Sequence, residues 1–117
     1  MQLIPVTRIP AQTFVVDLKG PVSTDGKETA TQGCTMTLRW RQTRLYLDLK
    51  TADGIVCQGA ICQNRADVIQ SRSKYFTGTL HFFDLEGDEA PSWEGLNDRW
   101  VFLHVPKGED IPEALRH

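Results

Sequence analysis

Residues 38–49, Leu-Arg-Trp-Arg-Gln-Thr-Arg-Leu-Tyr-Leu-Asp-Leu, decide the fold class of this chain. Apolar and polar residues alternate along both halves of the stretch, and the polar residues 41–44 separate the halves. The alternating apolar positions are Leu38, Trp40, Leu45, Leu47 and Leu49. A period of two is typical of β-strands with one buried face. The stretch therefore predicts an antiparallel hairpin whose apolar face enters the core.

The opposite side of this hairpin is basic and supplies most of a candidate interface. Arginine and tyrosine are enriched in protein interfaces, and tryptophan often forms their energetic centre. A last strand that is apolar on both faces also suggests burial against another chain. The candidate interface residues are Arg39, Arg41, Arg44, Tyr46, Trp93, Leu96 and Trp100.

Further short runs with strand character occur at residues 2–7, 12–18, 55–63, 77–84 and 100–105. Six to seven short strands separated by turns predict an all-β fold, a small antiparallel sandwich or barrel with long loops. A length of 117 residues is that of one domain, so we expect residues 1–117 to form a single β domain.

Two segments are predicted to lie outside the core. Residues 20–33, bracketed by glycines, have almost no side chain suited to burial and predict a flexible exposed hairpin loop. Residues 107–117 predict a polar C-terminal tail.

Two predicted strands carry features that affect their faces. Gly59 lies in the middle of residues 55–63 and predicts a bulge or a close backbone approach there. In residues 100–105 both sets of alternating positions are largely apolar, and we expect Val101, Leu103 and Val105 to face the core. Trp100, Phe102 and His104 would then lie opposite.

The balance of charge argues against several partners. The chain has 13 basic and 15 acidic residues, a net charge of -2, which gives no reason to expect nucleic acid. No apolar run is long enough to cross a bilayer, and the start lacks the features of a signal peptide. We therefore expect a cytoplasmic chain whose three cysteines stay reduced and are mostly buried.

Catalytic and metal-binding patterns are weak in this sequence. His81 and His104 lie in predicted strands and could face each other across a sheet, but no nucleophile motif accompanies them, and we expect them to be ordinary sheet histidines. Cys57 and Cys62 lack the spacing of a zinc or redox pair. The acidic residues from Asp84 to Asp98 fail the register of a calcium-binding EF-hand and predict a solvated loop. We expect neither cofactor nor metal and no enzymatic activity.

The chain resembles the small baseplate plug proteins of contractile-tailed phages. The resemblance lies in residues 12–14 after a proline-containing start, the hairpin of residues 38–49, the strand with Gly59 and the loop of residues 91–96. It covers residues 2–106, although residues 20–33 are longer than the family pattern. It implies a mainly β, non-enzymatic virion protein of the tail baseplate. It also implies contacts with hub, tube or sheath-initiating components, whereas the net charge and the lack of a long apolar run predict no nucleic-acid or membrane partner.

From these observations we predict a structural protein that plugs or locks the hub/tube junction of a baseplate. The chain would be present in host cytoplasm during assembly and in the virion afterwards. An alternative is a carbohydrate- or small-ligand-binding sandwich in which Tyr46, Trp93 and Trp100 form a stacking platform. A hydrolase that depends on His81 or His104 is a third hypothesis.

Overall fold

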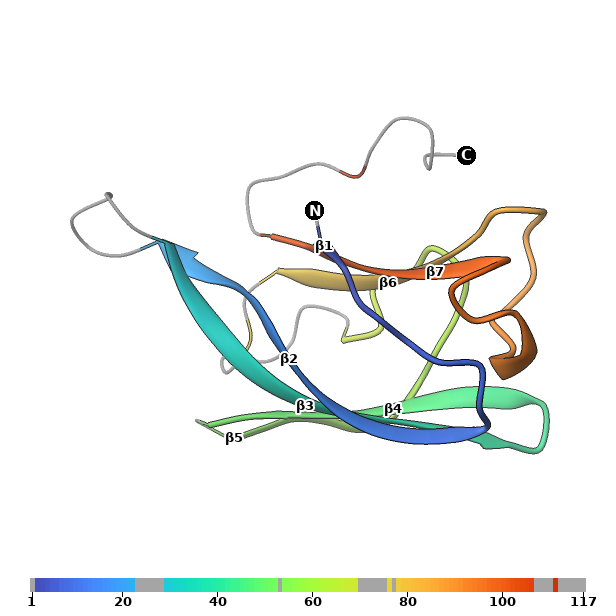
Figure 1. Ribbon diagram of the computed structural model, residues 1–117, viewed down its shortest axis with the longest axis horizontal. Helices are drawn as coiled ribbons and strands as arrows, with labels where there is room; N and C mark the ends of the chain where they lie inside the picture. Colours follow the sequence, from blue (N-terminus) through green and yellow to red (C-terminus); the bar gives the residue numbers. More distant parts are fainter. Residues whose placement is uncertain are drawn as a thin grey trace.

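Two antiparallel sheets face each other in the computed structural model and form a sandwich (Figure 1). The structure describes residues 2–22, 29–52, 54–69, 76, 78–106 and 111, without the side chains of residues 19–22 and 29–30. One layer is a three-stranded sheet in the order β1-β7-β6, and the other is a four-stranded sheet in the order β2-β3-β4-β5. The elements are β1 (Gln2–Leu3), β2 (Ala11–Val22), β3 (Thr29–Arg41), β4 (Arg44–Thr51), β5 (Gly54–Ile61), β6 (Thr79–Asp84), the 3-10 helix η1 (Trp93–Gly95) and β7 (Trp100–Val105). The predicted all-β fold is confirmed.

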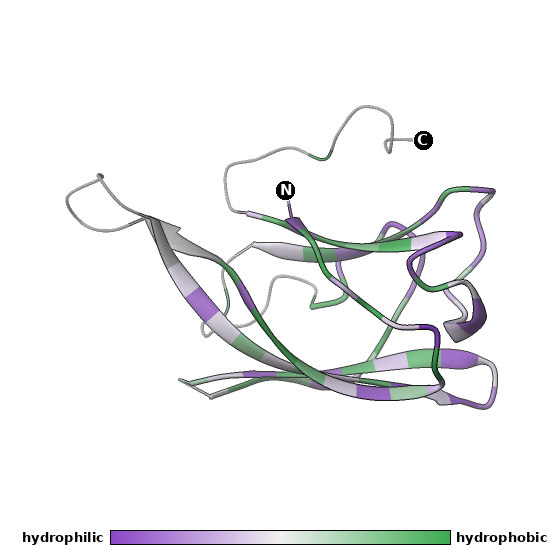
Figure 2. Ribbon diagram, in the orientation of Figure 1, coloured by the Kyte–Doolittle hydropathy of each residue, from purple (hydrophilic) through white to green (hydrophobic). Residues whose placement is uncertain are grey.

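The predicted hairpin is β3 and β4, joined by a turn at Gln42 and Thr43. Leu38 lies opposite Leu47, and Trp40 lies opposite Leu45. Figure 2 shows the alternation of hydrophobic and hydrophilic positions along these strands. The inward leucines Leu38, Leu45, Leu47 and Leu49 are fully buried, and Trp40 packs against them at the edge of the core. The hairpin and its inner face are therefore confirmed.

The prediction of a loop is wrong at both ends of residues 20–33. β2 continues to Val22 and β3 begins at Thr29, and the rest of the prediction falls on residues 23–28, which lie outside the described residues. Beyond the pair of Cys34 and Thr51, β3 pairs with β2 alone. The polar composition of this segment predicted a loop. The prediction failed because a two-stranded ribbon, joined by main-chain hydrogen bonds, needs few apolar residues. The predicted tail of residues 107–117 lies outside the described residues except for Ile111.

The predicted bulge at Gly59 is confirmed. Leu47 pairs with Ala60 and Leu49 pairs with Cys57, so β5 has one more residue than β4 between these pairs. Gly59 has a φ of +63°, a left-handed conformation that favours glycine. The extra residue also brings Cys57 and Cys62 to the same side, where Cys62 is buried and Cys57 packs against the core.

The faces predicted for β7 are reversed in the structure. The side that packs on the four-stranded sheet carries Trp100, Phe102 and His104, all buried. The ring of Phe102 stacks on that of Phe82 in β6, with centroids 4.1 Å apart. Leu103 and Val105 are buried on the other side of the sheet. Period-two alternation chooses a face only when the opposite face is polar, and β7 is apolar on both.

Residues 64–69 follow β5 and run along β6. Asn64 forms a parallel bridge with Phe82, and the N–H groups of Arg65 and Val68 donate to the carbonyl oxygens of Phe82 and Leu80. This segment supplies hydrogen-bond partners to an edge that would otherwise be open.

The described residues contain no helix long and apolar enough to cross a membrane.

The reversed faces of β7 can be tested by truncating neighbouring side chains. We expect Phe102→Ala to lower the free energy of unfolding by about 3–5 kcal/mol, because it removes a fully buried ring from between the sheets. Val101→Ala is the matched control, since Val101 is only partly buried, and should cost about 1 kcal/mol. Urea denaturation measures both variants. A larger loss for Val101→Ala would contradict the assigned faces.

Candidate protein interface

The four-stranded sheet has a side that points away from β6 and β7, here named the outer face. Its residues are Thr13, Val15, Thr35, Thr37, Arg39, Arg41, Arg44, Tyr46, Asp48, Lys50, Ile55 and Ile61. The strand register places Val15, Thr35, Lys50 and Ile55 in one row across the sheet. Val15 is 74% exposed and Ile55 is 56% exposed. The outer face therefore combines exposed apolar side chains with polar and charged ones, as protein interfaces do.

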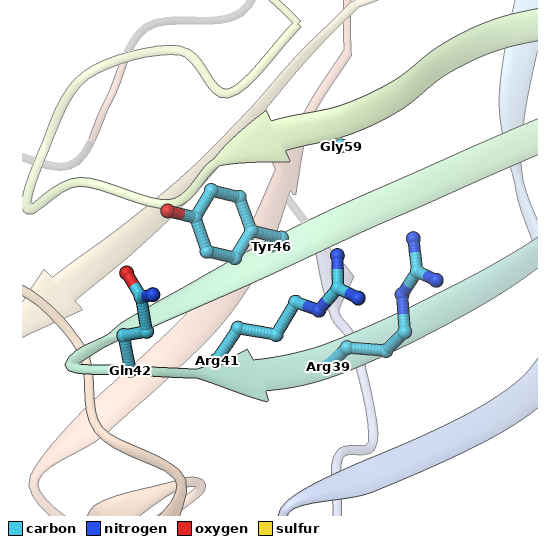
Figure 3. A pocket seen from close by; sticks show the side chains of 5 residues that line it. All are labelled: Arg39, Arg41, Gln42, Tyr46 and Gly59. Carbon is cyan, nitrogen blue, oxygen red and sulfur yellow. The ribbon is translucent and has the colours of Figure 1, made fainter.

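A hollow of about 490 Å³ opens at the turn end of the outer face (Figure 3). Its lining residues, here named the basic hollow, are Arg39, Arg41, Gln42, Tyr46 and Gly59. Both arginines extend from β3, Tyr46 extends from β4, and Gly59 is the bulge residue of β5. The bulge shapes this hollow because it places a residue without a side chain beside the long arginine and tyrosine side chains.

Asp48 connects the three strands around the basic hollow. Its Oδ2 accepts a hydrogen bond from Nη2 of Arg39 at 2.6 Å, and its Oδ1 accepts one from the Gly59 backbone N–H at 2.7 Å. A carboxylate that accepts the bulge N–H satisfies a donor that the strand ladder leaves free. The Arg39–Asp48 ion pair is partly exposed, so its contribution to stability is modest. Its main effect is to hold Arg39 in place.

Arg41 and Arg44 form a different kind of pair. They lie directly opposite each other in the register of β3 and β4, and both are exposed. Neither takes part in an ion pair within the part of the chain that the structure describes. Like charges at opposed positions destabilise a hairpin. The hairpin therefore carries a repulsion that the described chain does not compensate.

The seven predicted interface residues separate into two groups. Arg39, Arg41, Arg44 and Tyr46 share the outer face. Trp93 belongs to η1 and is half-buried against the core. Leu96 and Trp100 are buried, so the prediction that they lie on a surface is wrong. A loop followed by a strand edge is a common place for exposed residues, but here the loop folds back over the sandwich.

The predicted stacking platform is not assembled. Trp100 is buried, and its Nε1 donates to the Glu89 carbonyl oxygen at 3.0 Å. Tyr46 belongs to the outer face of the other sheet, while Trp93 packs against the core. Three aromatic rings in separate environments do not form one surface on which a sugar could stack.

The acidic loop after β6 is organised by Asp84 and Arg99. Asp84 is fully buried and accepts two hydrogen bonds from the Arg99 guanidinium, each 2.8 Å long. It also accepts hydrogen bonds from the backbone N–H groups of Glu86 and Glu89, each 2.9 Å long. Arg99 lies over the Trp100 ring, 4.5 Å from its centroid. The prediction of a wholly solvated acidic loop is therefore wrong at its first residue.

These contacts determine the protonation of the pair. Hydrogen bonding from Arg99, joined by the N–H groups of Glu89 and Glu86, holds the pKa of Asp84 well below its ordinary value against the opposing effect of burial. The hydrogen bonds between Arg99 and Asp84 also raise the pKa of Arg99. Sequence reasoning missed this pair, although Arg99 is the first basic residue after the six acidic residues in the range from Asp84 to Asp98.

A family model described as "Cyanophage baseplate Pam3 plug gp18" matches residues 1–107 of the chain. The chain belongs to this family. The predicted resemblance to baseplate plug proteins is thereby confirmed, and membership points to a structural component of the phage tail baseplate that contacts other baseplate proteins. No curated protein matches the chain.

The histidines of this baseplate plug family member do not form a shared site. His104 pairs with Leu80 and His81 pairs with Leu103, so the two rings lie on opposite sides of the sheet. Nδ1 of His81 donates to the Arg65 carbonyl oxygen at 2.6 Å, and its Nε2 lies 2.7 Å from Thr79 Oγ1. The alternative in which the two histidines face each other is therefore not formed, because they are an odd number of positions apart in the ladder.

The three cysteines are free thiols with weak nucleophilic character. Burial raises the pKa of Cys34 and of Cys57 to about 11, and it raises the pKa of Cys62 as well. Thiols with raised pKa values are almost entirely protonated near neutral pH, and the thiolate is the reactive form. Within the described ranges, no group of three or more His, Cys, Asp or Glu side chains is placed to hold a metal ion.

The Asp84–Arg99 pair leads to a prediction about acid stability. A lowered pKa means that Asp84 stabilises the fold fully above its ordinary pKa of about 3.9 and loses this contribution as the pH falls below it. Asp84→Asn should lower the Tm at pH 7 by about 5 °C or more, because it leaves Arg99 without its buried partner. Between about pH 5 and pH 2, the Tm of the variant should fall less steeply than that of the unaltered chain.

Asp88→Asn is the matched control for this measurement. Asp88 is highly exposed and pairs with Arg65 at 3.3 Å, so its loss should change the Tm little. Thermal unfolding followed by circular dichroism at each pH measures all three proteins. Parallel pH curves for the unaltered chain and Asp84→Asn would contradict the assigned role of Asp84.

Proposed function

We propose that this chain is a non-enzymatic plug of a phage tail baseplate that fills or locks the junction between hub and tube. In this proposal it binds neighbouring baseplate proteins through the outer face of its four-stranded sheet. The observation that carries the proposal is the uncompensated pair of Arg41 and Arg44 beside the basic hollow. An exposed repulsion of this kind has a use if a neighbouring protein supplies the opposite charge.

The composition of the outer face supports a protein partner. Arg39, Arg41 and Tyr46 belong to the residue types that most often dominate binding energy at interfaces. Val15 and Ile55 add exposed apolar area at the other end of the same face. Together they offer the apolar contacts and polar rim that a specific interface needs. Hub, tube and sheath-initiating components are the proposed partners, with no role for nucleic acid or membrane.

The proposed mechanism is mechanical. The core between the two sheets keeps the outer face rigid, so that the chain can hold a junction without changing shape. Contacts rich in charged and polar groups exchange partners more easily than large apolar interfaces do. We therefore propose that the plug is released or changes partners when the tail contracts. Structures of extended and contracted tails test this, and an unmoved plug in both states would exclude it.

The role of the outer face can be tested by charge reversal. Arg41→Glu with Arg44→Glu should reduce incorporation into baseplates about tenfold or more, because a like-charge contact costs several kcal/mol and 1.4 kcal/mol corresponds to tenfold. Both residues are exposed at the hairpin turn, so the fold and the Tm should be preserved. Arg39 is unsuitable for this test because its reversal would oppose Asp48.

Quantitative mass spectrometry of purified baseplates measures the incorporation. Arg8→Glu is the control, since Arg8 lies between β1 and β2 and both Arg8 and its partner Asp98, 3.6 Å away, are well exposed, so that water and salt screen the reversed charge. It should be incorporated like the unaltered chain. Normal incorporation of the double variant would exclude the outer face, and absence of the unaltered chain from baseplates would exclude the plug function.

A further inference from the structure

We infer that the basic hollow and Arg44 receive carboxylate side chains from an acidic segment of a neighbouring baseplate protein. The inference rests on the proposed function, because it takes the neighbour to be a baseplate subunit. It goes further by naming the chemical group that the outer face recognises and the residues that bind it.

The first argument comes from charge. Among the side chains that the structure describes, four cations lie on the outer face, namely Arg39, Arg41, Arg44 and Lys50. The carboxylate of Asp48 is close to Arg39, and both of its oxygens already accept hydrogen bonds within the sheet. It is therefore committed and does not neutralise Arg41 or Arg44. An acid from another chain would remove the repulsion between these two guanidinium groups.

The second argument comes from the hydrogen-bonding groups in the hollow. Arginine has only donors, and the exposed Arg41 takes part in no ion pair among the described residues. Gln42 and Tyr46 add an amide and a hydroxyl group that can also donate. A lining dominated by donors matches an acceptor with two oxygens, and guanidinium groups bind carboxylates through paired hydrogen bonds.

The third argument comes from space. A Cβ atom built on Gly59 would meet nothing within 4 Å, so this side of the hollow is open and the chain's own atoms do not fill it. The hydrogen bond from Gly59 to Asp48 keeps the bulge in its present shape. A side chain of a partner can therefore enter beside Gly59 and reach the arginines of β3.

The apolar part of the outer face decides between a protein carboxylate and a nucleic-acid phosphate. Val15 and Ile55 are exposed on the same face, and they suit contact with a protein surface better than with a phosphate backbone. Nucleic-acid binding also depends on the neutralisation of many phosphates by clustered cations. The chain has more acidic than basic residues, and only Arg41, Arg44 and Lys50 on this face have no ion pair among the described residues.

Carbodiimide cross-linking tests the inference in assembled baseplates. Arg41→Lys with Arg44→Lys retains both charges and adds amines that the reagent can join to a carboxylate. The carbodiimide activates the carboxylate, the amine attacks it to form an amide bond, and the reagent leaves as a urea that has taken up the elements of water. We expect incorporation below that of the unaltered chain, because lysine keeps the charge but not the paired hydrogen bonds of arginine, and above that of Arg41→Glu with Arg44→Glu. We also expect amides that join position 41 or 44 to Asp or Glu of another baseplate protein.

Arg8→Lys is the matched control for the reagent. Arg8 lies 3.6 Å from Asp98, so the introduced amine should form an amide with Asp98 of the same chain. Mass spectrometry of the digested cross-links identifies each pair. If the control reacts and positions 41 and 44 do not, although the double variant is incorporated, the inference is overturned while the plug function stands. Cross-links from these positions only to acidic residues of another copy of this chain would also overturn it.

Binding to nucleic acid provides a second readout on the purified chain. A 20-nucleotide DNA duplex is the probe, and fluorescence anisotropy at 50 mM salt measures its binding. We expect that any binding of the duplex is unchanged in the variant Arg41→Glu with Arg44→Glu. If the duplex binds the unaltered chain and its affinity falls at least tenfold in this variant, the hollow binds phosphate and the inference is overturned.

Discussion

Burial of the inner face of the β3–β4 hairpin is the constraint on which the other features of this structure depend. Each inward leucine contributes about 1.5–3 kcal/mol when it is removed from water. A slip of one residue in the pairing would turn the inward side chains of one strand outward and bring its outer residues, Arg39 in β3 or Asp48 in β4, into the core. The register is therefore fixed by the core, and the register in turn assigns every residue of the outer face.

The bulge in β5 gives this outer face its shape. A regular edge strand would present side chains at even spacing and a nearly flat surface. The extra residue at Gly59 interrupts this spacing, and Asp48 holds both the bulge and Arg39 through one carboxylate. The basic hollow is consequently built from three strands and the tight β3–β4 turn, which contributes Gln42. Bulges also make an edge strand a poor template for pairing with other chains, which directs association to the face of the sheet.

The Asp84–Arg99 pair has a corresponding function at the other sheet. A carboxylate that accepts two backbone N–H groups and a guanidinium group orders the start of a loop rich in like charges. The Arg99 guanidinium pairs with the buried Asp84 carboxylate and also lies 3.6 Å from Glu86 and 3.3 Å from Glu89. The start of the acidic loop is thus held in place by Asp84 and Arg99. Trp100 is buried, and its ring lies beneath the Arg99 guanidinium.

The sequence by itself determined the fold class, the hairpin, the faces of β3 and β4 and the bulge at Gly59. These features depend on local alternation and on the conformational freedom of glycine, both of which are written in neighbouring residues. Membership of the baseplate plug family was also apparent from the order of such motifs. Only the tertiary structure decided the faces of β7, the burial of Leu96 and Trp100, and the partner of Asp84. Their environments depend on residues distant in the chain, and a strand that is apolar on both sides contains no local signal of which side meets the other sheet.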